Sequence, residues 1–107
     1  MNKEEKELRK IEKNKDIAFA KEMKAKDGNK CAICGRVEYL HTHHIIPRED
    51  REFRHDPMNV ITLCAKHHKF SLDISPHRNA FCFFLWLMEN RIEKFNYLKN
   101  KLGGNDE

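Results

Sequence analysis

The sequence predicts a small α+β domain in which a β-hairpin and a short helix are flanked by a longer helix at each end. Residues 1–28 are rich in Lys and Glu and carry apolar side chains at helical spacing. Residues 38–46 and 60–63 are rich in β-branched, aromatic and histidine residues, which is typical of short strands. Between residues 78 and 102, apolar residues recur three or four positions apart and predict a final helix.

Turn residues set the expected boundaries of these elements. Asp27-Gly28-Asn29 is expected to end the first helix, and Gly103-Gly104 the last. Ser75-Pro76 is expected to separate the last helix from a short one over residues 64–71. The acidic tail at residues 105–107 is expected to fray. The core-facing stripe of the final helix is expected to contain Phe81, Phe84, Leu85, Met88, Ile92, Phe95, Leu98 and Leu102.

Length and composition favour a single domain over residues 1–107 that a bound metal stabilises. The chain has no apolar run of about 18 residues, and its first thirty residues are charged, so we expect a cytoplasmic protein without a membrane segment. In a reducing compartment the four cysteines are better candidates for metal ligands than for disulfides. The net charge of +4 suits a polyanionic partner and equally suits a merely soluble protein.

Two short motifs predict a structural zinc site. Cys31-Ala32-Ile33-Cys34 and Cys64-Ala65-Lys66-His67 each place two residues between the candidate ligands. This spacing lets a tight turn or a helix start direct both side chains at one tetrahedral ion. Residues 35–63 separate the two pairs, which is a longer gap than in a plain zinc finger, so we expect a functional insert there.

The insert carries an ordered set of polar residues. His43-His44 follows the first expected strand, Asn59 precedes the second, and His68 directly follows the last zinc ligand. With the cysteine pairs, this pattern closely resembles the HNH endonuclease family, whose fold is called ββα-metal or His-Me finger. The resemblance covers residues 30–68, within an expected zinc and ββα-metal core at residues 30–71.

The resemblance implies a metal-dependent DNA endonuclease that nicks or cuts its substrate. It implies that His44 is the general base, that Asn59 fixes the loop and orients the base, and that His43 and His68 bind one divalent ion such as Mg²⁺ or Mn²⁺. His43 stands where many members have aspartate, which leaves less negative charge at the ion. Residues 84–91 also look like the tails of small phage or prophage members, which implies a bacterial or phage-encoded protein.

Elementary chemistry agrees with these roles. Successive side chains of an extended chain point to opposite faces, so His43 can bind an ion while His44 faces the attacking water. A neutral imidazole with a pKa near about 6.5 can accept a proton at physiological pH. On a helix, His67 and His68 project about 100° apart, so that one can face the zinc and the other the catalytic ion.

Other basic residues surround the motif. These residues are candidates for contacts with DNA phosphates, and the alternative is that they are ordinary surface charge: Arg36, Arg48, Arg51, Arg54, Lys66 and Lys69. His41, His55 and His77 are expected to pack or face solvent. For His77, which follows Ser75-Pro76, a contact with phosphate or with the metal site is an alternative.

Two other functions stay open. The chain can be a non-catalytic zinc-stabilised module that binds nucleic acid, with structural histidines. It can also be an adaptor in which the aromatic helix from Phe81 onward exposes an adhesive face, an alternative that burial of the helix would remove. No helix-turn-helix is recognisable, so we expect the specificity for DNA sequence to be low or to be supplied by a protein partner. We expect the chain itself to be a monomer or a weak oligomer.

Overall fold

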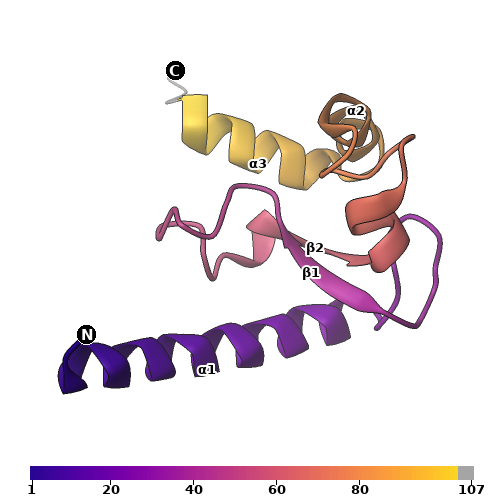
Figure 1. Cartoon of the computed structure of the whole chain (residues 1–107). Coiled ribbons are helices and arrows are strands. Elements are labelled where there is room, and N and C mark those ends of the chain that lie inside the picture. The colour runs from indigo at the N-terminus through magenta and orange to yellow at the C-terminus, as the bar shows by residue number, and fades with distance from the viewer. Residues whose placement is uncertain (104–107) are drawn as a thin grey trace.

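A computed structural model describes residues 1–103 of the chain, which form three layers (Figure 1). The helix α1 (Lys3–Lys26) lies on one side of a hairpin formed by β1 (Leu40–His44) and β2 (Val60–Cys64). The helices α2 (Ala80–Asn90) and α3 (Ile92–Gly103) lie on the other side. A 3₁₀ turn, η1 (Pro57–Asn59), precedes β2, and a five-residue π-helix, η2 (Lys66–Phe70), follows it. The predicted α+β class and the ββα order are confirmed, whereas the predicted fraying at residues 105–107 lies outside the described residues.

The hairpin pairs its strands antiparallel, with His43 opposite Ile61 and His44 opposite Val60. All residues of β2 are buried, because α1 covers one face of the hairpin and α2 packs on the other. Side chains alternate between the two faces of a strand. His43 and Ile61 therefore point toward α2, while His44 points toward α1, and both contacts are seen: His43 packs against Phe83, and His44 against Phe19.

The ends of α1 are fixed by side chains. Asn2 accepts a hydrogen bond from the Glu5 backbone N–H, and the Glu5 carboxylate accepts one from the Asn2 N–H, so the first turn is capped reciprocally. The helix ends at Asp27, and Gly28 has a φ of 79°, which is unfavourable for residues with a side chain. The Asp27 carboxylate accepts a hydrogen bond from Thr62 N–H at 3.0 Å, which attaches this end of α1 to β2.

The prediction of one helix over residues 78–102 is wrong, because the chain breaks at Arg91 into α2 and α3. Arg91 has φ −140° and ψ 55°, outside the helical region, although no Gly or Pro marks the break in the sequence. Its guanidinium lies 5.5 Å from the centre of the Trp86 ring. After the bend, α3 packs against both α2 and η1.

The predicted apolar stripe was wrong in its register in α2. Phe83 and Leu87 of α2 are 1% exposed and pack on Ile61 and Leu63, whereas Phe81 is 73% exposed. In α3 the predicted stripe is confirmed at Leu98, which is buried, and at Phe95, which packs against the core, whereas Ile92 and Leu102 are exposed. Because α2 is buried on one face only and Phe81 is exposed on the other, a role of the chain as a protein-interaction adaptor stays open. Within residues 1–103, no helix is both long and apolar enough to cross a bilayer.

We expect Phe83→Ala to lower the free energy of unfolding by about 3–5 kcal/mol, the usual cost of emptying a buried phenylalanine site. Phe81→Ala, two residues away on the same helix, is the matched control and should cost less than about 0.5 kcal/mol because its ring faces solvent. Urea unfolding of the zinc-loaded protein measures both. Equal losses would contradict the buried face assigned to α2.

Candidate functional site

Three cysteines and one histidine converge on a single point. The ligand atoms of Cys31, Cys34, Cys64 and His67 all lie within 4.8 Å of one another. Cys34 Sγ is 3.8 Å from Cys64 Sγ, and His67 Nδ1 is 3.8 Å from Cys31 Sγ and 3.3 Å from Cys64 Sγ. A tetrahedral zinc with bonds of about 2.0–2.3 Å places its ligand atoms roughly 3.3–3.8 Å apart. These four side chains therefore fit zinc.

Local structure explains how the first cysteine pair reaches this point. The chain turns back after Cys34, where Gly35 has a φ of 79° and donates its N–H to the Cys31 carbonyl at 2.9 Å. The Ile33 N–H lies 3.4 Å from Cys31 Sγ. Burial raises the pKa of the Cys31 thiol, but backbone N–H groups around the sulfur outweigh it and leave that pKa lowered. These N–H groups thus favour the thiolate of Cys31, which is the form that binds zinc.

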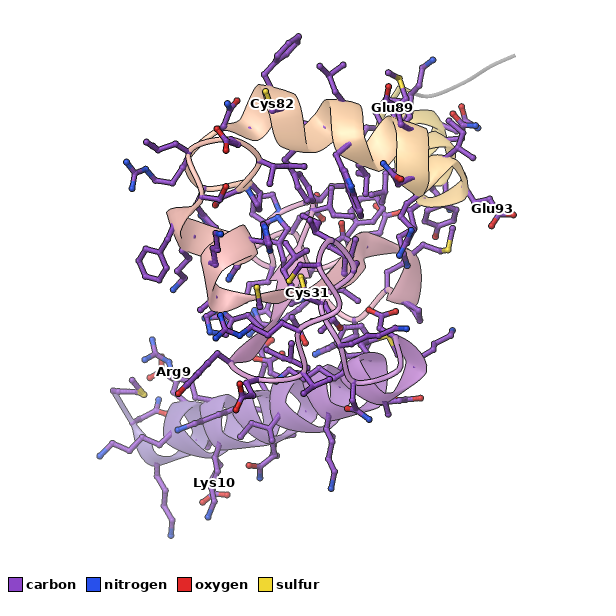
Figure 2. All side chains as sticks on the ribbon, turned by 90° about the vertical axis from the view of Figure 1, so that its right-hand side faces the viewer. Arg9, Lys10, Cys31, Cys82, Glu89 and Glu93 are labelled. Atoms are coloured by element: carbon purple, nitrogen blue, oxygen red, sulfur yellow. The ribbon has the colours of Figure 1, made fainter. Side chains whose placement is uncertain are left out.

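Cys31 lies at the centre of the molecule between α1 and the α2–α3 layer, as Figure 2 shows. Cys82 lies on α2, partly buried and away from the cluster (Figure 2). The zinc-fitting site therefore connects the hairpin with the α2 layer: Cys31 packs in the core with Ile61 and Phe83, and Cys64 ends β2.

A second cluster consists of three imidazoles from three segments. His43 comes from β1, His68 from η2 and His77 from the turn before α2, and their ligand atoms lie within 4.8 Å of one another. His68 Nε2 is 3.1 Å from both His43 Nδ1 and His77 Nε2. Nitrogen atoms bound to one divalent ion at about 2.0–2.1 Å lie roughly 3 Å apart. The three side chains therefore fit a divalent metal ion.

Burial keeps the imidazoles of His43 and His68 neutral. It lowers the pKa of His43 to about 3, with further lowering by the neighbouring His68. It lowers the pKa of His68 to about 4, with further lowering by His77. A neutral imidazole is the form that binds a metal ion, so His43 and His68 do not have to lose protons near neutral pH to bind one.

His41 contacts the same cluster from behind. Its Nδ1 is 2.8 Å from His68 Nδ1, so one of these two nitrogens donates to the other. When Nε2 of His68 binds an ion, its Nδ1 carries the hydrogen and donates it to His41. His41 thereby fixes the orientation and the tautomer of His68, although sequence reasoning expected it only to pack or face solvent.

His77 is the site residue that sequence reasoning left among the packing histidines. The turn that carries it is held by Ser75, which is fully buried, donates its Oγ–H to the His68 carbonyl at 2.7 Å and accepts from the His77 N–H at 3.3 Å. The alternative of a metal contact for His77 is the one that the geometry favours. In the sequence, Ser75-Pro76 indicates a turn next to His77, but it does not indicate that this turn packs beside His68.

His44 lies beside the three-imidazole cluster and faces the other side of β1. Its Nε2 is 2.9 Å from the Arg54 carbonyl oxygen. Since a carbonyl can only accept, Nε2 carries the hydrogen and Nδ1 is left as the basic nitrogen. Burial lowers the pKa of His44, partly opposed by this hydrogen bond.

Asn59 is fully buried and acts on the backbone. Its Oδ1 accepts from the Ile46 N–H at 2.7 Å, and its Nδ2 donates to the carbonyls of Ile46 and Phe53 at 2.9 and 3.0 Å. The structure brings no contact between this amide and His44. Asn59 instead closes the loop that follows His44, so its effect on the base passes through the loop.

The imidazoles open onto a surface hollow of about 570 Å³. His43, His44, His68 and His77 line it, together with Arg48 and Lys69. Among the expected phosphate-contacting residues, these two exposed cations are therefore nearest to the site. Arg36 and Lys66 are also exposed but do not line the hollow, and Arg36 lies over the Tyr39 ring.

Arg51 and Arg54 are engaged by α1. Arg51 pairs with Glu12, and Arg54 binds Asp16 through two nitrogens, at 2.6 and 3.0 Å. The Arg54 hydrogen bond is the main cause that lowers the pKa of Asp16 to about 2. Sequence reasoning could not foresee these pairs, because they join residues that are far apart in the chain.

These features define a ββα-metal domain with two clusters suited to metal ions. The family model described as HNH endonuclease matches residues 31–69, from the first zinc-fitting cysteine to the end of η2, and confirms the resemblance over this segment. An HNH domain implies a nuclease fold and a nucleic-acid substrate. Comparison with curated proteins and with solved structures found no significant match. The helix α1 and His77 lie outside the matched segment.

We expect one tightly bound zinc per chain, and we expect its removal by a strong chelator to unfold the domain, because the ligands hold the turn at residues 31–34, β2 and η2 together at the core. Elemental analysis and thermal unfolding measure this. Cys34→Ser should lose zinc and stability, while Cys82→Ser, the control, should retain both. Full thermal stability of the metal-free protein would refute a structural role for zinc.

Proposed function

We propose that the chain is a metal-dependent endonuclease that hydrolyses phosphodiester bonds of DNA, with His44 as the general base. The observation that carries the proposal is the placement of His44 in one hollow with three imidazoles that fit a divalent ion. Its Nε2–H is already bound by the Arg54 carbonyl, so Nδ1 is free to accept the proton of a water molecule.

The ion is proposed to be held by His43, His68 and His77. When bound, a divalent ion supplies charge stabilisation at the phosphate and at the leaving oxygen. Three neutral imidazoles suit Mn²⁺, Co²⁺, Ni²⁺ or Zn²⁺ better than Mg²⁺, which prefers oxygen ligands. Of the two ions expected from sequence, the donor set thus favours Mn²⁺. His41 keeps the His68 ring oriented, and Asn59 keeps the loop after His44 closed.

DNA is proposed to approach the hollow through its phosphates. Arg48 and Lys69 line the hollow and supply positive charge on its rim. These contacts carry no sequence information, so target choice is low or comes from a protein partner. A cytoplasmic location, a bacterial or phage origin and a monomeric or weakly oligomeric state are parts of the same proposal and rest on the sequence alone.

The second candidate function is a zinc-stabilised module that binds nucleic acid without cutting it. One observation favours it: His41, His43 and His77 all lie within 3.1 Å of a His68 nitrogen, an arrangement that can also stabilise a fold without an ion. The two functions differ in whether the zinc-loaded protein cleaves DNA when a divalent ion is added.

We expect His44→Ala to lower the rate of plasmid nicking by about a hundredfold or more, the usual contribution of a general base, with zinc content and DNA affinity retained. His68→Ala and His77→Ala should instead weaken ion binding, so that a higher Mn²⁺ concentration partly restores their activity. Ion concentration should not restore His44→Ala, whereas added imidazole should. The measurement is a nicking time course across Mn²⁺ concentration.

Undiminished cleavage by His44→Ala would overturn the assignment of the base. Absence of cleavage by the parent protein with every divalent ion tested would favour the binding module. Lys66→Ala is a suitable control, because this exposed cation of η2 does not line the hollow and its loss should leave the turnover rate unchanged.

The pH dependence should follow the lowered pKa of His44. Only the neutral imidazole accepts a proton, so the rate should rise with pH through the pKa of His44. Because burial lowers that pKa, the midpoint of the rise should lie below the ordinary value of 6.5. The pKa values of His43 and His68, about 3 and 4, are too low to set this midpoint. A rate–pH profile with a midpoint above 6.5 would contradict the burial of the base.

A further inference from the structure

The helix α1 lies outside the segment that matches the HNH family, yet it holds the loop next to the proposed base. Both carboxylate oxygens of Asp16 accept from Arg54: Oδ1 from Nε at 3.0 Å and Oδ2 from Nη2 at 2.6 Å. His55 Nε2 lies 2.8 Å from Asp16 Oδ1. A two-point pair of this kind fixes the direction of the guanidinium as well as its position.

The backbone of the same arginine holds the base. The carbonyl of Arg54 accepts the Nε2–H of His44 at 2.9 Å. The preceding carbonyl, of Phe53, accepts from Asn59 Nδ2 at 3.0 Å. The Arg54 Nη1 also reaches the Arg48 carbonyl, at 3.4 Å. The direction of the Arg54 carbonyl is therefore set from both sides, by Asn59 within the family segment and by Asp16 from α1.

A ring from α1 completes the arrangement. Phe19, three residues after Asp16, packs at 6.4 Å from the His44 ring and edge-on at 5.3 Å from the His55 ring. Thr42, on the same face of β1 as His44, donates its hydroxyl to the Ala20 carbonyl at 3.4 Å. The segment of α1 from Asp16 to Ala20 thus contacts β1, the His44 ring and the loop that carries Arg54 and His55.

We propose that Asp16 is a positioning residue for His44, acting through Arg54. The inference rests on the proposed function, since it assumes that His44 is the base. With Asp16 in place, the Arg54 carbonyl stays directed at Nε2, which keeps the hydrogen on that nitrogen and leaves Nδ1 as the basic nitrogen. Without it, the carbonyl is free to turn, and the His44 ring loses the bond that selects its tautomer and orientation.

A neighbouring ion pair offers a matched comparison. Glu12 and Arg51 join the same helix to the same loop, but the Arg51 side chain is 73% exposed against 15% for Arg54. No bond connects Arg51 to His44 in the described structure, residues 1–103. Glu12 Oε2 also lies 3.6 Å from Arg54 Nε, but Asp16 binds the same guanidinium at two shorter distances, 3.0 and 2.6 Å. Loss of the Glu12 carboxylate should therefore remove an attachment of the loop while Asp16 still holds Arg54 at two points.

The test is plasmid nicking by the zinc-loaded protein with Mn²⁺, comparing Asp16→Asn and Glu12→Gln. Asp16→Asn should lower kcat by about tenfold, a part of the total that a general base contributes, with KM and zinc content within about twofold. Glu12→Gln should match the parent. Removing a negative charge favours phosphate binding, so weaker DNA affinity cannot explain a lower rate for Asp16→Asn.

The same substitution in a His44→Ala background separates positioning from a general loss of structure. If Asp16 acts through His44, Asp16→Asn should cost less than about twofold once His44 is absent, because coupled residues are not additive. A tenfold loss in both backgrounds would overturn the inference, and so would parent-like cleavage by Asp16→Asn. Arg54→Lys, which keeps the charge but not the two-point geometry, should behave like Asp16→Asn.

A readout that needs no cleavage keeps the inference distinguishable from the proposed function. Nitrogen NMR of the zinc-loaded protein at about pH 8 reports which ring nitrogen of His44 carries the hydrogen. The parent and Glu12→Gln should show the hydrogen on Nε2, and Asp16→Asn a mixture of tautomers. An unchanged tautomer in Asp16→Asn would overturn the inference whether or not the parent protein cleaves DNA. Absence of cleavage by the parent protein would instead refute the proposed nuclease function.

Discussion

The antiparallel pairing of β1 with β2 is the constraint on which both clusters depend. It places His43 opposite the buried Ile61 and so directs His43 toward the layer that carries His77 and Phe83. The same register leaves His44 on the face of α1. A shift of one residue would exchange these faces, and the ion ligand and the base would change places. Such a shift is costly because it would remove Ile61 and Leu63 from their packing against Phe83 and Leu87.

The two clusters are joined by a single peptide bond. His67 points its Nδ1 at the three cysteines, and His68 points its Nε2 at His43 and His77. The rings can diverge because adjacent residues of a helical turn project in different directions. When the zinc-fitting site holds His67 in place, it also holds the backbone of His68, because the two residues are adjacent in the chain. This connection explains how so small a domain, with few fully buried side chains, holds its histidines at defined distances.

Much of the site could be predicted from sequence because its signals are local. The spacing within each cysteine pair depends only on turn geometry, and the structure brings the four expected ligands together. The contribution of His77 could not be predicted, since it depends on how the turn around Ser75 packs on η2. The break at Arg91 was missed because no Gly or Pro marks it in the sequence.

The engagement of Arg54 by α1 was beyond sequence reasoning for the same kind of reason. Asp16 and Arg54 are distant in the chain, and a Lys- and Glu-rich helix gives no sign of which acid is paired. The expectation that Arg54 contacts phosphate treated its charge as available, whereas its side chain is 15% exposed and bound at two points. Which cations remain free for a partner is a property of the folded surface, and composition alone does not determine it.

The adjacency of His67 and His68 also bears on how the sequence can change in evolution. An insertion or deletion between Cys64 and His68 would rotate one ring away from its cluster, so the length of this segment is fixed by geometry. The surface loop between Pro47 and Asp56 is under weaker constraint at its start, because its bonds to Asn59, His44 and α1 come from the stretch between Arg51 and His55. Length variation among relatives should therefore accumulate near Arg48 to Asp50, where it would reshape the rim of the hollow while both clusters stay intact.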